Sequence, residues 1–195
     1  MTIHTIGDSH ARFGWTNIIN HNCWSMLCYN FGREKLNRVN ISNFDIKDGD
    51  TVVFCFGEVD CRCHIHKHIT DDISYQSIID DIVSNYFEAI QINITVSGLN
   101  FKKICVYNVV PPIEKYNTEE NPSYPYLGTD EERKDYVLYF NKKLKEYCIK
   151  YSYTFFDIYD KYIDNNGYLR KDLSDNIVHI NNGIYINDFI VENDI

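Results

Sequence analysis

The chain has 195 residues, of which 44% are hydrophobic, 24% charged and 15% aromatic. This composition excludes disordered and collagen-like proteins, and the length predicts one domain, residues 1–195, around a single core. The 28 acidic side chains outnumber the 19 basic ones, which gives a net charge of -9. An acidic chain lacks the generic attraction to phosphate backbones and anionic lipid, so we expect neither a nucleic-acid nor a membrane partner.

The amino terminus carries neither the basic segment nor the apolar run of a secretory signal. No later stretch approaches the roughly 20 apolar residues that cross a bilayer. We therefore expect a cytoplasmic protein, and the abundance of Ile, Asn, Lys and Tyr indicates an AT-rich coding genome, such as that of a protist, a low-GC bacterium or a large virus. The seven cysteines, several of them inside apolar runs, predict reduced thiols in a core rather than a disulfide framework.

The first half of the chain alternates short apolar runs with helical patterns. Residues 2–6 predict a first buried strand, and residues 10–22 are a candidate first helix. Residues 38–41 are a candidate second strand, and residues 51–56 predict a third. Isoleucines at helical spacing then predict a long helix over residues 71–96, with Gly98 at its C-terminal cap.

The second half repeats the alternation. Residues 103–110 and 153–158 predict strands on either side of a helix over residues 130–151, which begins with a capping box from Thr129 to Glu132. Residues 111–128 hold all four prolines and predict a long ordered loop. Strands alternating with helices indicate an α/β protein with helices on both faces of a sheet.

Gly7, Asp8 and Ser9 directly follow the first predicted strand. Ligands bind at the carboxyl ends of strands in open α/β sheets, and free N–H groups at a helix start can stabilise an oxyanion. Ser9 is therefore a candidate nucleophile. The alternative is that Asp8 or Ser9 only caps the following helix.

A nucleophilic serine needs a base, and the candidate is His179, near the end of the chain. A carboxylate beside the imidazole would fix its tautomer and raise its basicity, and Asp175 is the nearest one in the sequence. A lone histidine is otherwise an ordinary surface or core residue.

These residues belong to a set of blocks whose order resembles that of the SGNH (GDSL-type) hydrolases and acyltransferases. The resemblance extends over nearly the whole chain and implies a three-layer α/β/α, flavodoxin-like (SGNH hydrolase-like) fold with a mostly parallel central sheet. The blocks are Gly7-Asp8-Ser9, Gly57-Glu58-Val59-Asp60, Val109-Val110-Pro111-Pro112 and the histidine close to the C-terminus.

Carried over by position, the resemblance implies that Ser9 is the nucleophile and donates its own N–H to the oxyanion, with His179 as general base. Gly57 opens the block whose residues surround the oxyanion. The second backbone donor of the family is a glycine after the second strand, and Gly32 is the glycine of that region.

Two positions depart from the family pattern. The third block normally reads Gly-x-Asn-Asp, and Val59 replaces the asparagine, whose amide donates to the oxyanion. Loss of such a donor can cost about 3 kcal/mol of transition-state stabilisation, so Arg62 is a candidate stand-in. The last block normally has Asp three residues before His; here Asn176 holds that place and Asp175 lies one residue earlier, so a backbone group or a displaced carboxylate orients His179.

The run from Cys61 to His68 offers a different site, because Cys and neutral His are common zinc ligands. If the run is extended, His64, His66 and His68 share one face. The spacing matches no standard zinc motif, and we favour a segment that lines the pocket, with Arg62 and His64 binding polar substrate groups.

The sequence therefore predicts a serine-dependent ester hydrolase or O-acyltransferase without a cofactor or bound metal, acting on an O-acylated carbohydrate or another small ester. Tyr116, Tyr124 and Tyr126 could offer faces to a sugar ring or simply anchor their loop. Two alternatives stay open: a binding protein impaired by Val59, and a metal-dependent hydrolase built on residues 61–68. The acyl chain, the acceptor and the oligomeric state are not specified.

Overall fold

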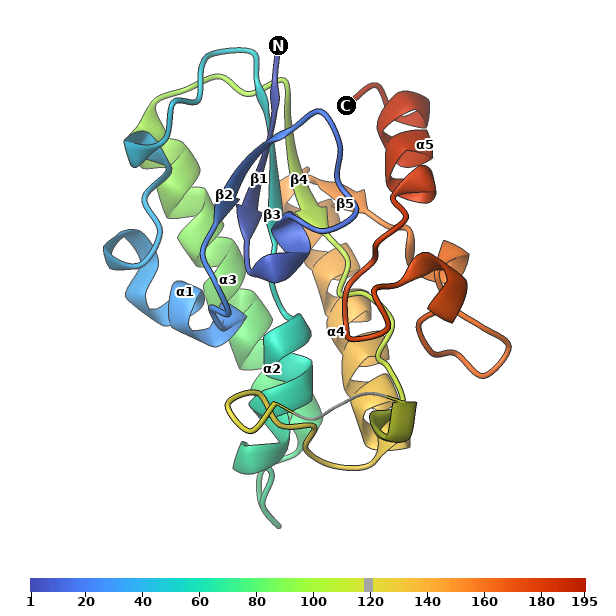
Figure 1. Cartoon of the computed structure of the whole chain (residues 1–195). Coiled ribbons are helices and arrows are strands. Elements are labelled where there is room, and N and C mark those ends of the chain that lie inside the picture. Colours follow the sequence, from blue (N-terminus) through green and yellow to red (C-terminus); the bar gives the residue numbers. More distant parts are fainter. Residues whose placement is uncertain (118–120) are drawn as a thin grey trace.

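The computed structural model describes residues 1–117 and 121–195, which form a parallel sheet covered on both faces (Figure 1). The strands lie in the order β2-β1-β3-β4-β5, and every neighbouring pair is parallel. This order is the flavodoxin-like one, and it brings the carboxyl ends of all strands to one edge. The strands are β1 (Ile3–Gly7), β2 (Ile19–Asn22), β3 (Thr51–Cys55), β4 (Lys103–Tyr107) and β5 (Thr154–Phe156).

Helices of different lengths cover the two faces. On one face lie α1 (Cys28–Glu34), α3 (Tyr75–Ser97) and α4 (Asp130–Tyr151), with α2 (Glu58–Cys63) following β3. On the other face lies α5 (Ile184–Glu192), as Figure 1 shows. None of the helices in the described ranges is long and apolar enough to span a bilayer.

Alternation along the buried strands divides the core between the two faces. On β3, Val52 and Phe54 join the cluster under α1, α3 and α4, whereas Val53 and Cys55 join the cluster under α5. All four side chains are buried. A central strand of this kind must be apolar on both sides, which explains its unbroken hydrophobic run.

The predicted elements with strong patterns are present. The helix expected over 71–96 is α3, which begins after the Ser74 cap and ends at Gly98 in a left-handed conformation. The helix expected over 130–151 is α4, with the capping box between Thr129 and Glu132 formed. The four strand predictions correspond to β1, β3, β4 and β5, each shorter than or shifted slightly from its apolar run.

Two predictions were wrong. Residues 10–22 do not form a helix: after a 3-10 turn at Ser9–Ala11 the chain runs into the edge strand β2. Residues 38–41 do not form a strand, because they link two 3-10 turns, Lys35–Asn37 and Ile41–Asn43. The true second strand has a polar sequence, Ile-Asn-His-Asn, that lacks the apolar alternation of a buried strand. The predicted loop 111–128 contains a 3-10 turn at Lys115–Asn117, and its residues 118–120 lie outside the described residues.

Candidate active site

The site lies at the carboxyl end of β1. Gly7 ends this strand so close to β3 that a Cβ atom there would lie 1.9 Å from the carbonyl oxygen of Cys55. The Asp8 N–H donates to the same carbonyl oxygen at 3.1 Å. Only glycine fits this approach, and it holds the following turn, with Ser9, against the edge of the sheet.

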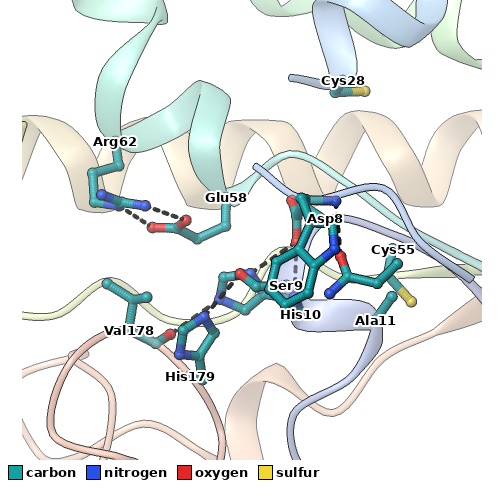
Figure 2. A network of polar contacts seen from close by, with 12 residues as sticks. Asp8, Ser9, His10, Ala11, Cys28, Cys55, Glu58, Arg62, Val178 and His179 are labelled. Carbon is teal, nitrogen blue, oxygen red and sulfur yellow. Dashed lines mark hydrogen bonds and ion pairs between the residues drawn. The ribbon is translucent and has the colours of Figure 1, made fainter. Parts of the chain in front are cut away.

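Ser9, His179 and Asp175 form a continuous hydrogen-bonded chain. Ser9 Oγ lies 2.8 Å from His179 Nε2, and His179 Nδ1 lies 2.6 Å from Asp175 Oδ2. Figure 2 shows the Ser9–His179 contact, which joins residues 170 positions apart. With Nδ1–H donating to the carboxylate, Nε2 is free to accept the hydroxyl proton, which is the arrangement of a nucleophile and its general base.

Asp175 also builds the turn that presents His179. Its Oδ1 accepts the backbone N–H groups of Ile177, Val178 and His179 at 2.8, 3.0 and 3.0 Å, and its own N–H donates to the His179 carbonyl at 3.0 Å. Asn176 has φ of 62°, in the left-handed region that Asn tolerates better than most residues. The left-handed conformation of Asn176 lets the carboxylate of Asp175, four positions before the histidine, reach the His179 ring.

The environment of these groups favours a neutral base beside an ionised carboxylate. Burial opposes ionisation of Asp175, but hydrogen bonds from His179 outweigh it and hold the pKa of Asp175 below its usual range. Burial, and then the charge on His10, lower the pKa of His179 more than Asp175 raises it. His179 therefore stays unprotonated to a lower pH than a free imidazole does.

A buried chain of opposite charges lies next to Ser9. His10 Nδ1 contacts Asp8 Oδ1 at 3.0 Å. Arg62 donates two hydrogen bonds to the Glu58 carboxylate, from Nε to Oε1 at 2.6 Å and from Nη2 to Oε2 at 3.1 Å. Figure 2 shows Glu58 between Arg62 and the Asp8–His10 pair. Burial raises the pKa of Glu58, but the charges of Arg62 and His10 outweigh it and keep that pKa below its usual value.

Ser9 and His179 open into a cavity of about 320 Å³. Its walls are mainly aromatic and apolar, and Trp24, which is 66% exposed, stands at its rim. The N–H of Ser9 has no acceptor within the described part of the chain, so it is available to a bound group. The lining residues are Ser9, Phe13, Trp24, Ser25, Val59, Arg62, Asn121, Tyr124, Tyr126, Ile177, Val178 and His179.

No protein-family model and no curated protein matches the sequence, whereas solved structures do. A GDSL-like lipase from Bacteroides thetaiotaomicron is similar with a TM-score of 0.62 and 16% identity, over 99% of this chain and 86% of the other. An aryl esterase from M. smegmatis is similar with a TM-score of 0.60 and 12% identity, over 98% of each chain. An acetylxylan esterase from Geobacillus stearothermophilus is similar with a TM-score of 0.59 and 13% identity, over 98% of this chain and 93% of the other.

The chain has the SGNH hydrolase fold. In it, three of the residues expected at the site line the cavity together: Ser9, His179 and Arg62. Asp175 stands behind His179. Gly57 caps α2 with φ of 121°, packed against Val109 and Phe140.

Gly32 and His64 do not line the Ser9 cavity. Gly32 lies inside α1, where a Cβ atom would come within 3.0 Å of the Asn85 backbone of α3, so it serves helix packing. The loop that follows β2 in the SGNH hydrolase fold is residues 23–27, and here Ser25 takes the positive φ of 51° that a glycine would favour. His64 lines a separate cavity with Tyr29 and His68.

Residues 61–68 are not extended, so the condition under which their three histidines would share one face is not met. They continue α2 into a 3-10 turn at Ile65–His68. His64 packs on Tyr29 and on His68, with ring centroids 4.6 and 4.4 Å away, whereas His66 Nδ1 contacts the Tyr136 hydroxyl at 3.0 Å. Across residues 1–117 and 121–195, no three His, Cys, Asp or Glu side chains are arranged to hold a metal ion.

The loop over the cavity is pinned by arginines. Arg62 Nη1 donates to the Tyr124 carbonyl at 2.7 Å, and the guanidinium groups of Arg62 and Arg133 each lie over the Tyr126 ring, with the guanidinium carbon 5.3 Å from the ring centroid. Tyr126 is buried and anchors the loop, and both Tyr124 and Tyr126 line the cavity. Tyr116 is 77% exposed and does not line the cavity.

Sequence reasoning missed several residues of the site. Trp24 and Ser25 were missed because the polar strand before them carried no strand pattern. Phe13 stacks on the His179 ring at 4.1 Å between centroids, and it was hidden in the segment expected to be helical. The spacing Glu58 to Arg62, four residues apart on one helix, was a usable signal for the buried ion pair.

Proposed function

We propose that this protein is a serine-dependent ester hydrolase of the SGNH type, with an O-acylated carbohydrate as its substrate class. The observation that carries the proposal is the hydrogen-bonded chain from Ser9 Oγ through His179 to the carboxylate of Asp175. Solved structures of the same fold include esterases and a lipase. The carbohydrate class is supported by the aromatic rings of Trp24 and Tyr124 at the cavity, since flat apolar faces stack on sugar rings.

The reaction would proceed by acyl transfer to Ser9. Its Oγ attacks the ester carbonyl carbon while His179 Nε2 takes the hydroxyl proton, and Asp175 stabilises the imidazolium. The Ser9 N–H donates to the developing oxyanion. The C–O bond of the ester then breaks, and His179 returns the proton to the leaving alkoxide. Water, or a sugar hydroxyl in a transferase reaction, attacks the acyl-enzyme in the same way and restores Ser9.

The test is hydrolysis of p-nitrophenyl acetate and of an acetylated xylo-oligosaccharide by the wild type, Ser9→Ala and His179→Asn. We expect both variants to lose at least about 1,000-fold in kcat/KM, and we expect a fluorophosphonate to label the wild type but not Ser9→Ala. Ser42→Ala, at an exposed serine in the Ile41–Asn43 turn that does not line the cavity, is the matched control and should keep full activity. Equal rates for wild type and Ser9→Ala, with no adduct, would refute the proposal.

A second candidate is a protein that binds an ester ligand and turns it over slowly or not at all. The observation that favours it is Val59, which lines the cavity in the place of an amide donor and is 4% exposed. Binding of an acetylated oligosaccharide to both wild type and Ser9→Ala, without hydrolysis by either, would support this candidate over the enzyme.

A further inference from the structure

His10 follows the proposed nucleophile directly and lies between two hydrogen-bond acceptors. Its Nδ1 is 3.0 Å from Asp8 Oδ1, and its Nε2 is 3.1 Å from the carbonyl oxygen of Val178. A carbonyl oxygen can only accept, and an ionised carboxylate can only accept. A neutral imidazole carries one N–H and would leave one of these contacts without a proton, whereas an imidazolium donates to both.

The groups that face His10 also favour the charged ring. Asp8 lies on the same turn, Glu58 faces the ring from α2, and the ring of His179 lies 4.9 Å away between centroids. The ring is 5% exposed, so these charges act with little screening by water. Burial lowers the pKa of His10, but Asp8 and Glu58 outweigh it and raise that pKa to about 9.

The two acceptors belong to the two halves of the proposed catalytic pair. Asp8 precedes Ser9, and Val178 precedes His179. The His10 ring therefore links the turn after β1 to the turn that carries the base. Figure 2 shows His10 beneath Ser9, with its contact to Val178 beside the His179 ring.

We propose that His10 is a permanently protonated positioning residue, whose imidazolium holds the Val178 carbonyl and so fixes His179 Nε2 against Ser9 Oγ. The catalytic part of this proposal rests on the proposed function, while the charge state of His10 does not. The positive ring disfavours a second positive charge on His179, whose other charged neighbours are Asp175 and Glu58. His10 thereby also keeps the base unprotonated.

The charge state is tested by NMR of protein labelled with ¹⁵N-histidine, which needs no activity. We expect the His10 ring to carry protons on both ring nitrogens at pH 7.5, and its signal to be absent in His10→Gln. In Asp8→Asn, which removes the partner charge, the same ring should begin to lose its proton between pH 6 and 8. A His10 ring that is neutral at pH 7 in the wild type would overturn the proposal.

The positioning role is tested by the pH dependence of kcat/KM for p-nitrophenyl acetate. We expect the acidic limb of His10→Gln to move upward by about one pH unit and kcat to fall about 10- to 100-fold, because the base gains a proton more easily and is held less firmly. His68→Gln, which changes an exposed ring outside the cavity, should keep both the limb and the rate.

Far-UV circular dichroism and thermal unfolding of each variant separate loss of fold from loss of positioning. If His10→Gln does not fold, Asp8→Asn serves for the pH profile. An acidic limb unchanged in a folded variant would overturn the positioning role. If instead Ser9→Ala keeps full activity, the proposed function fails, and the NMR result still decides the charge of His10.

Discussion

At the scale of single residues, Val59 is the cavity position that differs from the asparagine of the sequence block that this segment resembles. Its buried side chain lines the Ser9 cavity, and under the proposed function an amide at this position would donate to the oxyanion. We expect Val59→Asn to raise kcat for p-nitrophenyl acetate about 10- to 100-fold, because one preorganised donor is worth about that or more in a water-poor site. Stopped-flow measurement of acyl-enzyme formation checks the effect on the chemical step.

Val59→Leu is the matched control, since it changes shape at the same position without adding a donor. It should leave kcat unchanged or lower it. A decrease in Val59→Asn equal to that in Val59→Leu would show that the oxyanion is already stabilised by other groups, such as backbone N–H groups in the turn at Ser9 or the loop at residues 23–27.

The residues of the site were predictable in part. The contact between Ser9 and His179 was predictable, because the Gly7-Asp8-Ser9 block and the C-terminal histidine block both lie at the edge of the parallel sheet where the strands have their carboxyl ends. The reach of Asp175 was left open, because it depends on the left-handed conformation of Asn176, which a sequence does not specify. Gly32 was misplaced because it was chosen as the glycine of its region, although α1 packs it against α3.

At the scale of elements, length and periodicity decided what could be predicted. The helices α3 and α4 span 23 and 22 residues, and their capping residues can be recognised in the sequence. In contrast β2 has four residues and α1 has seven, and neither repeats a pattern long enough to stand out. These short elements are stabilised by tertiary contacts. The clearest of these is made by a carboxylate of α2 to the start of α1.

Asp60 supplies that contact and caps α1 from outside. Its Oδ2 and Oδ1 accept the N–H groups of Cys28 and Tyr29 at 2.6 and 3.0 Å, where the residue before the helix, Leu27, offers no side-chain cap. Burial is the largest influence on this carboxyl and raises the pKa of Asp60 to about 7. The folded protein therefore holds a proton here between about pH 4 and 7 that the unfolded chain has released.

Because the folded state binds the extra proton, the contribution of Asp60 to the free energy of unfolding is largest below pH 4 and is lost as pH rises through 7. As pH rises over this range, we expect the free energy of unfolding of the wild type to fall relative to that of Asp60→Asn, by about 1.4 kcal/mol for each unit by which folding raises the pKa of Asp60. Urea unfolding at half-unit pH intervals measures it. Asp71→Asn, at an exposed carboxylate, is the control for the comparison, and a flat difference for Asp60→Asn would contradict the assignment.

At the scale of the whole molecule, the site exists only when distant parts of the chain meet. The turn after β1, the loop after β2, α2 and the segment before α5 each contribute residues to one cavity. Two hydrophobic clusters, one on each face of the sheet, hold these segments in place. Formation of the Ser9–His179 contact is therefore coupled to folding of the whole sheet rather than to any local element.

The cysteines allow that coupling to be measured. All seven lie in the described part of the chain and are free, and all but Cys23 are buried on the two faces and at α2. Cys23 is half-buried, and burial is the main reason that its pKa rises to about 11. Since the thiolate is the reactive form, its reaction at pH 8 should be slower than that of a free thiol by a factor on the order of 100.

We therefore expect Ellman's reagent to titrate seven thiols in guanidinium chloride and at most one, slowly, in the native protein. Cys23→Ser should remove the native reaction and leave six thiols in denaturant. The six buried thiols should become reactive together as urea crosses the unfolding midpoint, because both faces of the sheet share strands and must open as one unit. Two or more fast native thiols would instead mean that one face opens without the other, and the cavity between Ser9 and His179 would then form and break by local motion.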